Sequence, residues 1–425
     1  MKGRALATIE SNKHKLERFV TTAFPVLFFV LFFTNPFAKV VASVASSLCI
    51  ILFFVTVLVL KKRSYQPEAR AYYLIMLVYL GAMGMSLIYT PALGDGLMRF
   101  QGQVTKFIMA VILIETISST VESRKYLVGT AAGGSVLAAI AIYEGVFRHV
   151  YRPPSMWNSV HGGNIFLFSL IALISLLLYE KNTRWRAAYI TTGLFMGYAF
   201  YLNGTRGAWI ALGIVLLLLP LIMRSMALPK KVAYYAVLLA LAGGLSQTPF
   251  IKDKVQEAQS NIQNYENADA RNSLGYRLEM WKASGKMFLR NPILGVGLGG
   301  WNEALVGMAA RKETPDFILH YNQTHNIYLD VLSTRGLLGF ITFMVIIGYP
   351  VFYAWKRREP ENELYRTLLI CATIALLVSG MTDTLVYIRG VFLAYILFVG
   401  LSLAVLVRRS PAENARPQNS GGALQ

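Results

Sequence analysis

The sequence predicts an all-α polytopic membrane protein with about 12 transmembrane helices and one large extracytoplasmic helical loop. Of its 425 residues, 55% are hydrophobic and only 15% are charged, against about 25% charged in a typical soluble domain. The apolar residues form blocks of roughly 20, the length with which a helix crosses about 30 Å of hydrocarbon. These observations exclude an ordinary water-soluble enzyme.

The apolar blocks define the expected transmembrane helices in chain order. The tenth block is too long for one straight crossing, and we expect a bend at Gly336 or Gly339. The predicted spans lie near residues 19–35, 38–60, 71–90, 103–118, 126–147, 162–179, 187–203, 207–223, 232–247, 324–354, 367–387 and 389–407.

The distribution of cations predicts the orientation of the chain. With the N-terminus inside, the cytoplasmic segments carry 24 Lys and Arg and the short outer loops carry six, which agrees with the positive-inside rule. The net charge of +19 therefore needs no nucleic-acid partner. We expect a cytoplasmic tail (1–18), nine spans (19–247), a large outer loop (248–322), three more spans (323–409) and a disordered cytoplasmic tail (410–425). The first tail lacks the pattern of a cleaved signal peptide.

The large outer loop contains two predicted helices. Apolar residues recur at helical spacing over 251–265, and a second helix is expected to end at Arg290 because Asn291-Pro292 stops it. Arg277 and Trp281 stand four residues apart and so share a face of that helix. The glycines over 295–300 match a dinucleotide fingerprint, but they open no βαβ unit. A flexible bend or an anion-binding nest is the favoured interpretation.

Five arginines at the predicted outer membrane edge have no explanation in the positive-inside rule. They are Arg99, Arg148, Arg152, Arg206 and Arg389. Arg206 follows a very tight turn between two spans, so its charge stays near the hydrocarbon boundary. A guanidinium fork at such a place suits bidentate binding of a phosphate. The alternative for each is an arginine that snorkels to lipid headgroups.

His325 lies where the large loop re-enters the membrane. Histidine suits the removal of a proton from a hydroxyl at neutral pH, and nearby guanidinium groups would keep the imidazole neutral. The alternative is a hydrogen-bonded packing residue. His320 and His325 are poor candidates for a metal site, because no paired carboxylate or Cys accompanies them in the loop. We therefore expect no metal.

The spacing after His325 resembles a known family signature. His325-Asn326 is followed by nine residues and then Gly336-Leu337-Leu338-Gly339, which is similar to the motif of the lipopolysaccharide O-antigen ligases, within the O-antigen ligase and polymerase superfamily. The resemblance extends to the span plan, to Arg277-x-x-x-Trp281 and to Asn291-Pro292. The arginine motif of the family usually ends in Leu, whereas the matching stretch here ends in Trp209.

The resemblance implies a glycosyltransferase of the bacterial inner membrane, with both termini cytoplasmic and the large loop periplasmic. Such an enzyme moves a finished O-antigen glycan from undecaprenyl diphosphate to lipid A–core, with inversion and without metal, nucleotide or other cofactor. His325 would be the base, and Arg206 and Arg277 would bind the donor diphosphate. Secondary candidates for substrate contact are Arg152, Arg389, Tyr321, Asn326 and Trp209; the last three are equally compatible with packing at a membrane interface.

Two other functions remain open from the sequence. A polymerase or a protein O-glycosyltransferase of the same superfamily would differ only in its acceptor, and a single large loop favours the ligase. A transporter or flippase of lipid-linked glycans would use the outer arginines for binding, but such proteins commonly have internal repeats and charges at mid-span. The sequence has no such repeat, and it assigns no role to Glu115, Glu144 or Asp330.

Overall fold

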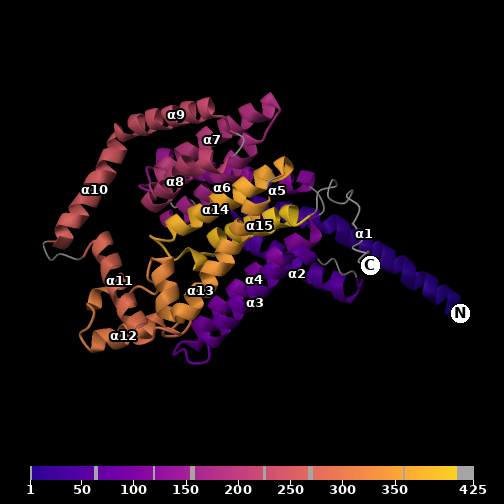
Figure 1. Ribbon diagram of the computed structural model, residues 1–425, viewed down its shortest axis with the longest axis horizontal. Helices are drawn as coiled ribbons and strands as arrows, with labels where there is room; N and C mark the ends of the chain where they lie inside the picture. Colours follow the sequence, from indigo (N-terminus) through magenta and orange to yellow (C-terminus); the bar gives the residue numbers. More distant parts are fainter. Residues whose placement is uncertain are drawn as a thin grey trace, which may run out of the picture.

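The protein is an all-helical polytopic membrane protein (Figure 1). The computed structural model describes residues 2–61, 66–117, 120–153, 158–223, 226–266, 271–357 and 359–408; the predicted tail 410–425 lies outside them. Each predicted span overlaps a helix, although several of the ends differ. These helices are α1 (Lys2–Thr34), α2 (Lys39–Leu58), α3 (Arg70–Met85), α4 (Leu93–Thr116), α5 (Thr120–Ile142), α6 (Ser159–Leu178), α7 (Thr183–Asn203), α8 (Arg206–Ile222), α9 (Leu228–Ser246), α13 (Ile327–Lys356), α14 (Glu363–Ser379) and α15 (Arg389–Leu406). Within the described ranges, nine helices are long and apolar enough to cross a membrane, so twelve crossings stay a prediction.

Three further helices project from one end of the bundle, opposite the start of α1 (Figure 1). They are α10 (Pro249–Glu266), α11 (Ser273–Arg290) and α12 (Trp301–Ala310). The end of α11 at Arg290 agrees with the stop predicted from Asn291-Pro292. A small core of its own, centred on Trp301, Met280 and Leu305, holds α11 against α12.

The helices α14 and α15 form the centre of the bundle. In the packing of the bundle, α15 lies along α4 and α14 lies along α8, and α15 is buried along almost its whole length. The predicted span over 367–387 is wrong at its end, because α14 stops at Ser379. Residues 380–388 instead form a connection that contains the short helix η5 (Leu385–Tyr387). This connection reaches the bundle end that carries α10–α12 (Figure 1).

Helix α13 is broken at Gly336, which has φ 62° and ψ −162°. The break exposes backbone amides that bond to the segment after α11: Leu337 N–H donates to the Pro292 carbonyl at 2.8 Å. In return, the Val296 and Gly297 amides donate to the carbonyls of Ser333 and Thr334 at 2.8 and 3.0 Å. The predicted bend is therefore confirmed. The two amides are not available to an anion, because they already donate to carbonyl oxygens of α13, so the nest interpretation is wrong for them.

Replacing Gly336 by alanine is expected to destabilise the protein. This backbone region is essentially restricted to glycine and costs another residue about 1–3 kcal/mol. An added Cβ would also lie 2.3 Å from the carbonyl carbon of Ile293. The matched control is Gly348→Ala in the same helix, where nothing lies within 4 Å of an added Cβ. Thermal unfolding in detergent should show a lower midpoint for Gly336→Ala alone, and equal midpoints would contradict this account.

Asp330, which had no assigned role, balances the buried Arg335 and the half-buried Arg99. Its carboxylate oxygens lie 3.9 Å from Arg99 and 3.8 Å from Arg335. Arg335 also donates to the hydroxyl of Tyr79 at 3.0 Å and to that of Tyr387 at 3.4 Å. Buried charges are tolerated in a membrane protein when they are paired in this way. The group ties α13 to α3, α4 and the connection between α14 and α15.

Candidate active site

His325 immediately precedes the N-cap residue of α13. Asn326 is that N-cap, and its side-chain oxygen accepts from the amides of Tyr328 and Leu329 at 3.0 and 3.1 Å. His325 itself has φ 49°, a conformation that is uncommon for residues other than glycine. The indole N–H of Trp281 donates to the Thr324 carbonyl at 3.1 Å. The base candidate is therefore held by both α13 and α11.

The imidazole of His325 is oriented by Asp383, a residue that sequence reasoning missed. Nδ1 of His325 lies 3.0 Å from Oδ1 of Asp383, and the Asp383 side chain is only 3% exposed. The same oxygen accepts from the Thr384 amide at 2.8 Å. An acceptor carboxylate at Nδ1 selects the tautomer with the proton on Nδ1. Nε2 is then left with its lone pair, as a general base requires.

The connection that carries Asp383 is bonded directly to the His325 segment. The Ile327 amide donates to the Gly380 carbonyl at 2.7 Å, and the Asn326 amide group donates to the Met381 carbonyl at 3.1 Å. These two contacts hold the two loops together. They also show that Asn326 already uses its side chain for capping and for this bond.

Arg206 is the first residue of α8, beside the same connection. The turn before it is bonded to the start of α6: the Thr205 hydroxyl and the Asn203 amide group both donate to the Ser159 carbonyl, at 2.8 and 3.0 Å. Gly207 packs against Thr382, and an added Cβ there would lie 2.2 Å from the Thr382 hydroxyl. The absence of a side chain at Gly207 therefore lets the arginine turn close on the segment next to Asp383.

Arg277, on α11, is close enough to this site for the charges of Asp383, Arg206 and Arg152 to act on it. Burial is the main cause of its lowered pKa, and the charges of Arg206 and Arg152 lower the pKa further, whereas Asp383 opposes them. An arginine keeps its charge even so. Within the described residues Arg277 has no carboxylate in ion-pair contact, and the Nε of Arg152 is buried without a hydrogen-bond partner.

Glu257 of α10 supplies a negative charge to the arginine group. It lies 3.4 Å from Arg206 and 2.9 Å from the buried Lys254. The hydrogen bond from Lys254 is the largest cause of its lowered pKa, and Arg206 and Arg152 contribute in the same direction. The cations still outnumber the carboxylates, which favours an anionic ligand.

The remaining predicted residues divide into two groups. Tyr321 packs edge-on against His325, with ring centroids 5.6 Å apart. Trp209 donates to the Phe200 carbonyl at 3.1 Å and stacks on Tyr201, so its polar atom is already bonded. Arg389 lines a separate cavity between α2 and α4. The structure thus brings together His325, Asp383, Arg277, Arg206, Arg152 and Tyr321.

Asp383 escaped sequence reasoning because the apolar run around it extends to residue 387. An aspartate at the end of such a run, in Thr382-Asp383-Thr384, was the available signal. The sequence analysis also did not single out His161, near the start of α6. This histidine lies close enough to the site for the charges of Asp383 and His325 to act on it.

These features define a membrane protein with a basic, histidine-containing site at one end of a helical bundle. Residues 191–344 match the family model described as O-antigen ligase. An uncharacterized protein of Haemophilus influenzae is 23% identical over 321 residues, which cover 73% of this chain and 78% of that protein. An O-antigen ligase of Escherichia coli is 22% identical over 157 residues, 36% of each chain. This family match and the weak similarity to an O-antigen ligase support the resemblance that the sequence showed.

Proposed function

We propose that this protein transfers an O-antigen glycan from undecaprenyl diphosphate to lipid A–core, at the periplasmic face of the bacterial inner membrane. The observation that carries the proposal is the bond between His325 and Asp383 beside three arginines. A hydroxyl acceptor needs a base, and a departing diphosphate needs cations. One site offers both.

In the proposed reaction, Nε2 of His325 takes the proton of the acceptor hydroxyl. The hydroxyl oxygen then forms its bond to the anomeric carbon on the side opposite the diphosphate, so the configuration inverts. The bond from that carbon to the diphosphate oxygen breaks, and the diphosphate leaves with the electron pair. Asp383 stabilises the imidazolium, as the buried aspartate of a catalytic triad does.

Arg277, Arg206 and Arg152 would bind the donor diphosphate. Guanidinium forks match phosphate oxygens in pairs, and Arg277 is free of a competing carboxylate contact within the described part of the chain. Binding would displace Glu257 from Arg206, where the present separation is 3.4 Å. Fixed arginines then stabilise the charge that develops on the leaving group.

The defining experiment supplies purified protein with undecaprenyl-diphosphate glycan and lipid A–core, in EDTA and without nucleotide. Transfer to lipid A–core is the expected result. Chain extension of a second lipid-linked glycan would identify a polymerase, and modification of a protein would identify a protein O-glycosyltransferase. Movement of the donor across a proteoliposome without any transfer would identify a flippase.

Arg206→Lys is expected to lower transfer at least about 10-fold, since lysine keeps the charge but loses the bidentate fork. The main effect should fall on the donor, as a higher KM for the lipid diphosphate. Arg148→Lys is the matched control, because Arg148 is an exposed arginine that ends the helix turn after α5. Wild-type kinetics for Arg206→Lys would show that Arg206 is a membrane anchor.

A further inference from the structure

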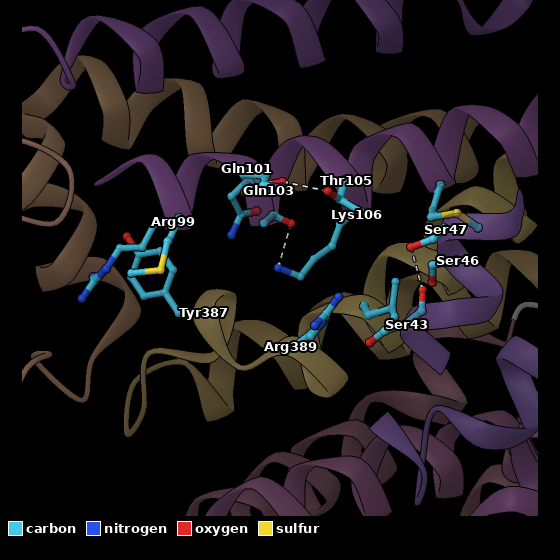
Figure 2. Close-up of a pocket in the computed structure, with 14 residues that line it drawn as sticks. Ser43, Ser46, Ser47, Arg99, Gln101, Gln103, Thr105, Lys106, Tyr387 and Arg389 are labelled. Atoms are coloured by element: carbon cyan, nitrogen blue, oxygen red, sulfur yellow. Dashed lines mark hydrogen bonds between the residues drawn. The ribbon is translucent and has the colours of Figure 1, made fainter. Parts of the chain in front are cut away.

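A basic cavity, separate from the His325 site, lies between α2, α4 and the start of α15. Its volume is about 410 Å³, and Arg99, Lys106 and Arg389 line it. None of the described residues that line it is acidic. Figure 2 shows the ends of the Lys106 and Arg389 side chains facing the same space, with the serines of α2 across from them. The reaction above gives these cations no part.

Lys106 carries the argument for a ligand. It lies within the predicted fourth span and is 93% buried (7% exposed), and its ammonium group donates to the Gly102 carbonyl of its own helix at 3.0 Å. The described part of the chain gives it no carboxylate partner. A buried cation in a membrane protein is costly unless it is paired, which makes it a mark of function.

Arg389 adds a second cation to the cavity. Its charge acts on Lys106, so two like charges face each other, and among the described residues neither has a carboxylate in ion-pair contact. Arg389 is also the first residue of α15, an 18-residue helix whose N-terminus carries partial positive charge. An anion placed between the two side chains would relieve their repulsion and meet the helix end.

The serines of α2 line the cavity with small, uncharged side chains. Ser43, Ser46 and Ser47 donate their hydroxyls to carbonyls of their own helix. Their small side chains leave room for a headgroup, and Met109 and Leu393 extend the wall with apolar atoms. The cavity therefore has a basic part for phosphate and an apolar part for a lipid chain.

The cavity and the His325 site contact different parts of the segment that joins α14 to α15. That connection holds Asp383 of the first site and leads into Arg389 of the second. Arg206 lies on α8, which packs against α14, whereas Lys106 lies on α4, which packs against α15. Arg99 joins the two sites: it donates to the Asn322 carbonyl at 3.1 Å, three residues before His325, and covers the Tyr387 ring at 4.3 Å.

We infer that this cavity binds a phosphate group of the acceptor lipid, on Lys106 and Arg389. The assignment to the acceptor rests on the proposed function, since the donor diphosphate already has the arginines near His325. Arg99, which lines the cavity, donates to the Asn322 carbonyl three residues before His325, so an acceptor phosphate held there would lie next to the segment that carries the proposed base.

The kinetic test compares Lys106→Gln and Arg389→Gln in the transfer assay. Each should raise the KM for the phosphorylated acceptor about 10-fold and leave kcat and the donor KM near wild type. Acceptor whose phosphates have been removed should have a raised KM on wild-type protein, and the variants should not raise it further. Arg148→Gln is the matched control. A raised donor KM, or an unchanged acceptor KM in both variants, would overturn the proposal.

A binding test separates this site from the enzymatic activity. In a His325→Ala background, protein in detergent is titrated with phosphatidic acid or, as a neutral match, with diacylglycerol. Phosphatidic acid alone should bind, and both charge variants should weaken that binding about 10-fold while Arg148→Gln does not. Equal binding by all variants would refute the phosphate site. If the charge variants weaken phosphatidic acid binding but the wild-type protein transfers glycan to no acceptor, the site is retained and the proposed function is rejected. Arg389 is exposed, so its variant tests the site even if Lys106→Gln does not fold.

Discussion

Replacing His325 by alanine is expected to lower glycan transfer by about 10²–10⁴-fold, the usual contribution of a general base. The loss should appear in kcat, because the arginines that bind the donor stay in place. Transfer is measured on purified protein with both lipid substrates, and donor binding is measured separately on the same preparation.

The backbone of His325 calls for a second variant. Its φ of 49° disfavours alanine, whereas asparagine tolerates this conformation. His325→Asn should therefore fold like the wild type but lose as much transfer activity as His325→Ala. His149→Asn is the matched control, because His149 is an exposed histidine with φ 53°. Transfer at the wild-type rate by either His325 variant would remove the base from the proposed reaction.

Replacing Asp383 by asparagine is expected to cost about 10²–10⁴-fold in kcat, by analogy with a triad aspartate. The amide group of asparagine would donate to Nδ1 of His325 and so place the imidazole proton on Nε2. The base is then blocked although the ring stays in position. The donor KM should change little, because Asp383 is not expected to contact the diphosphate.

A double-mutant cycle distinguishes this role from a purely structural one. If Asp383 acts through His325, then His325→Ala with Asp383→Asn should be no slower than His325→Ala alone. Asp316→Asn serves as a control, since Asp316 lies in the large loop at the start of η3 (Asp316–Ile318). Additive losses from the two substitutions would show that Asp383 acts independently of the imidazole.

Much of the fold follows from local properties of the chain. Hydropathy placed every predicted span on a helix, and Asn291-Pro292 correctly marked the end of α11 at Arg290. The break of α13 at Gly336 was also predicted from its glycines. The end of α14 was not, because the apolar residues continue past Ser379 although the helix stops there.

The candidate site was only partly predictable. His325, Arg206 and Arg277 stood out as residue types that are unusual at their positions. Their common neighbour Asp383 lies 58 residues from His325 in the chain, and no spacing rule connects the two. Arg389 was a secondary candidate for the same substrate, yet the packing of α15 on α4 places it in a separate cavity.

Hydropathy and unusual residue types were enough to predict a bundle of membrane helices with a histidine and several arginines near one end, because each of these signals is local to its segment. Which carboxylate contacts His325, and which cations share a cavity, depended on how distant helices pack. Those contacts arise from the shapes of buried side chains, such as the missing Cβ of Gly207 against Thr382, and a hydropathy pattern contains no information about them.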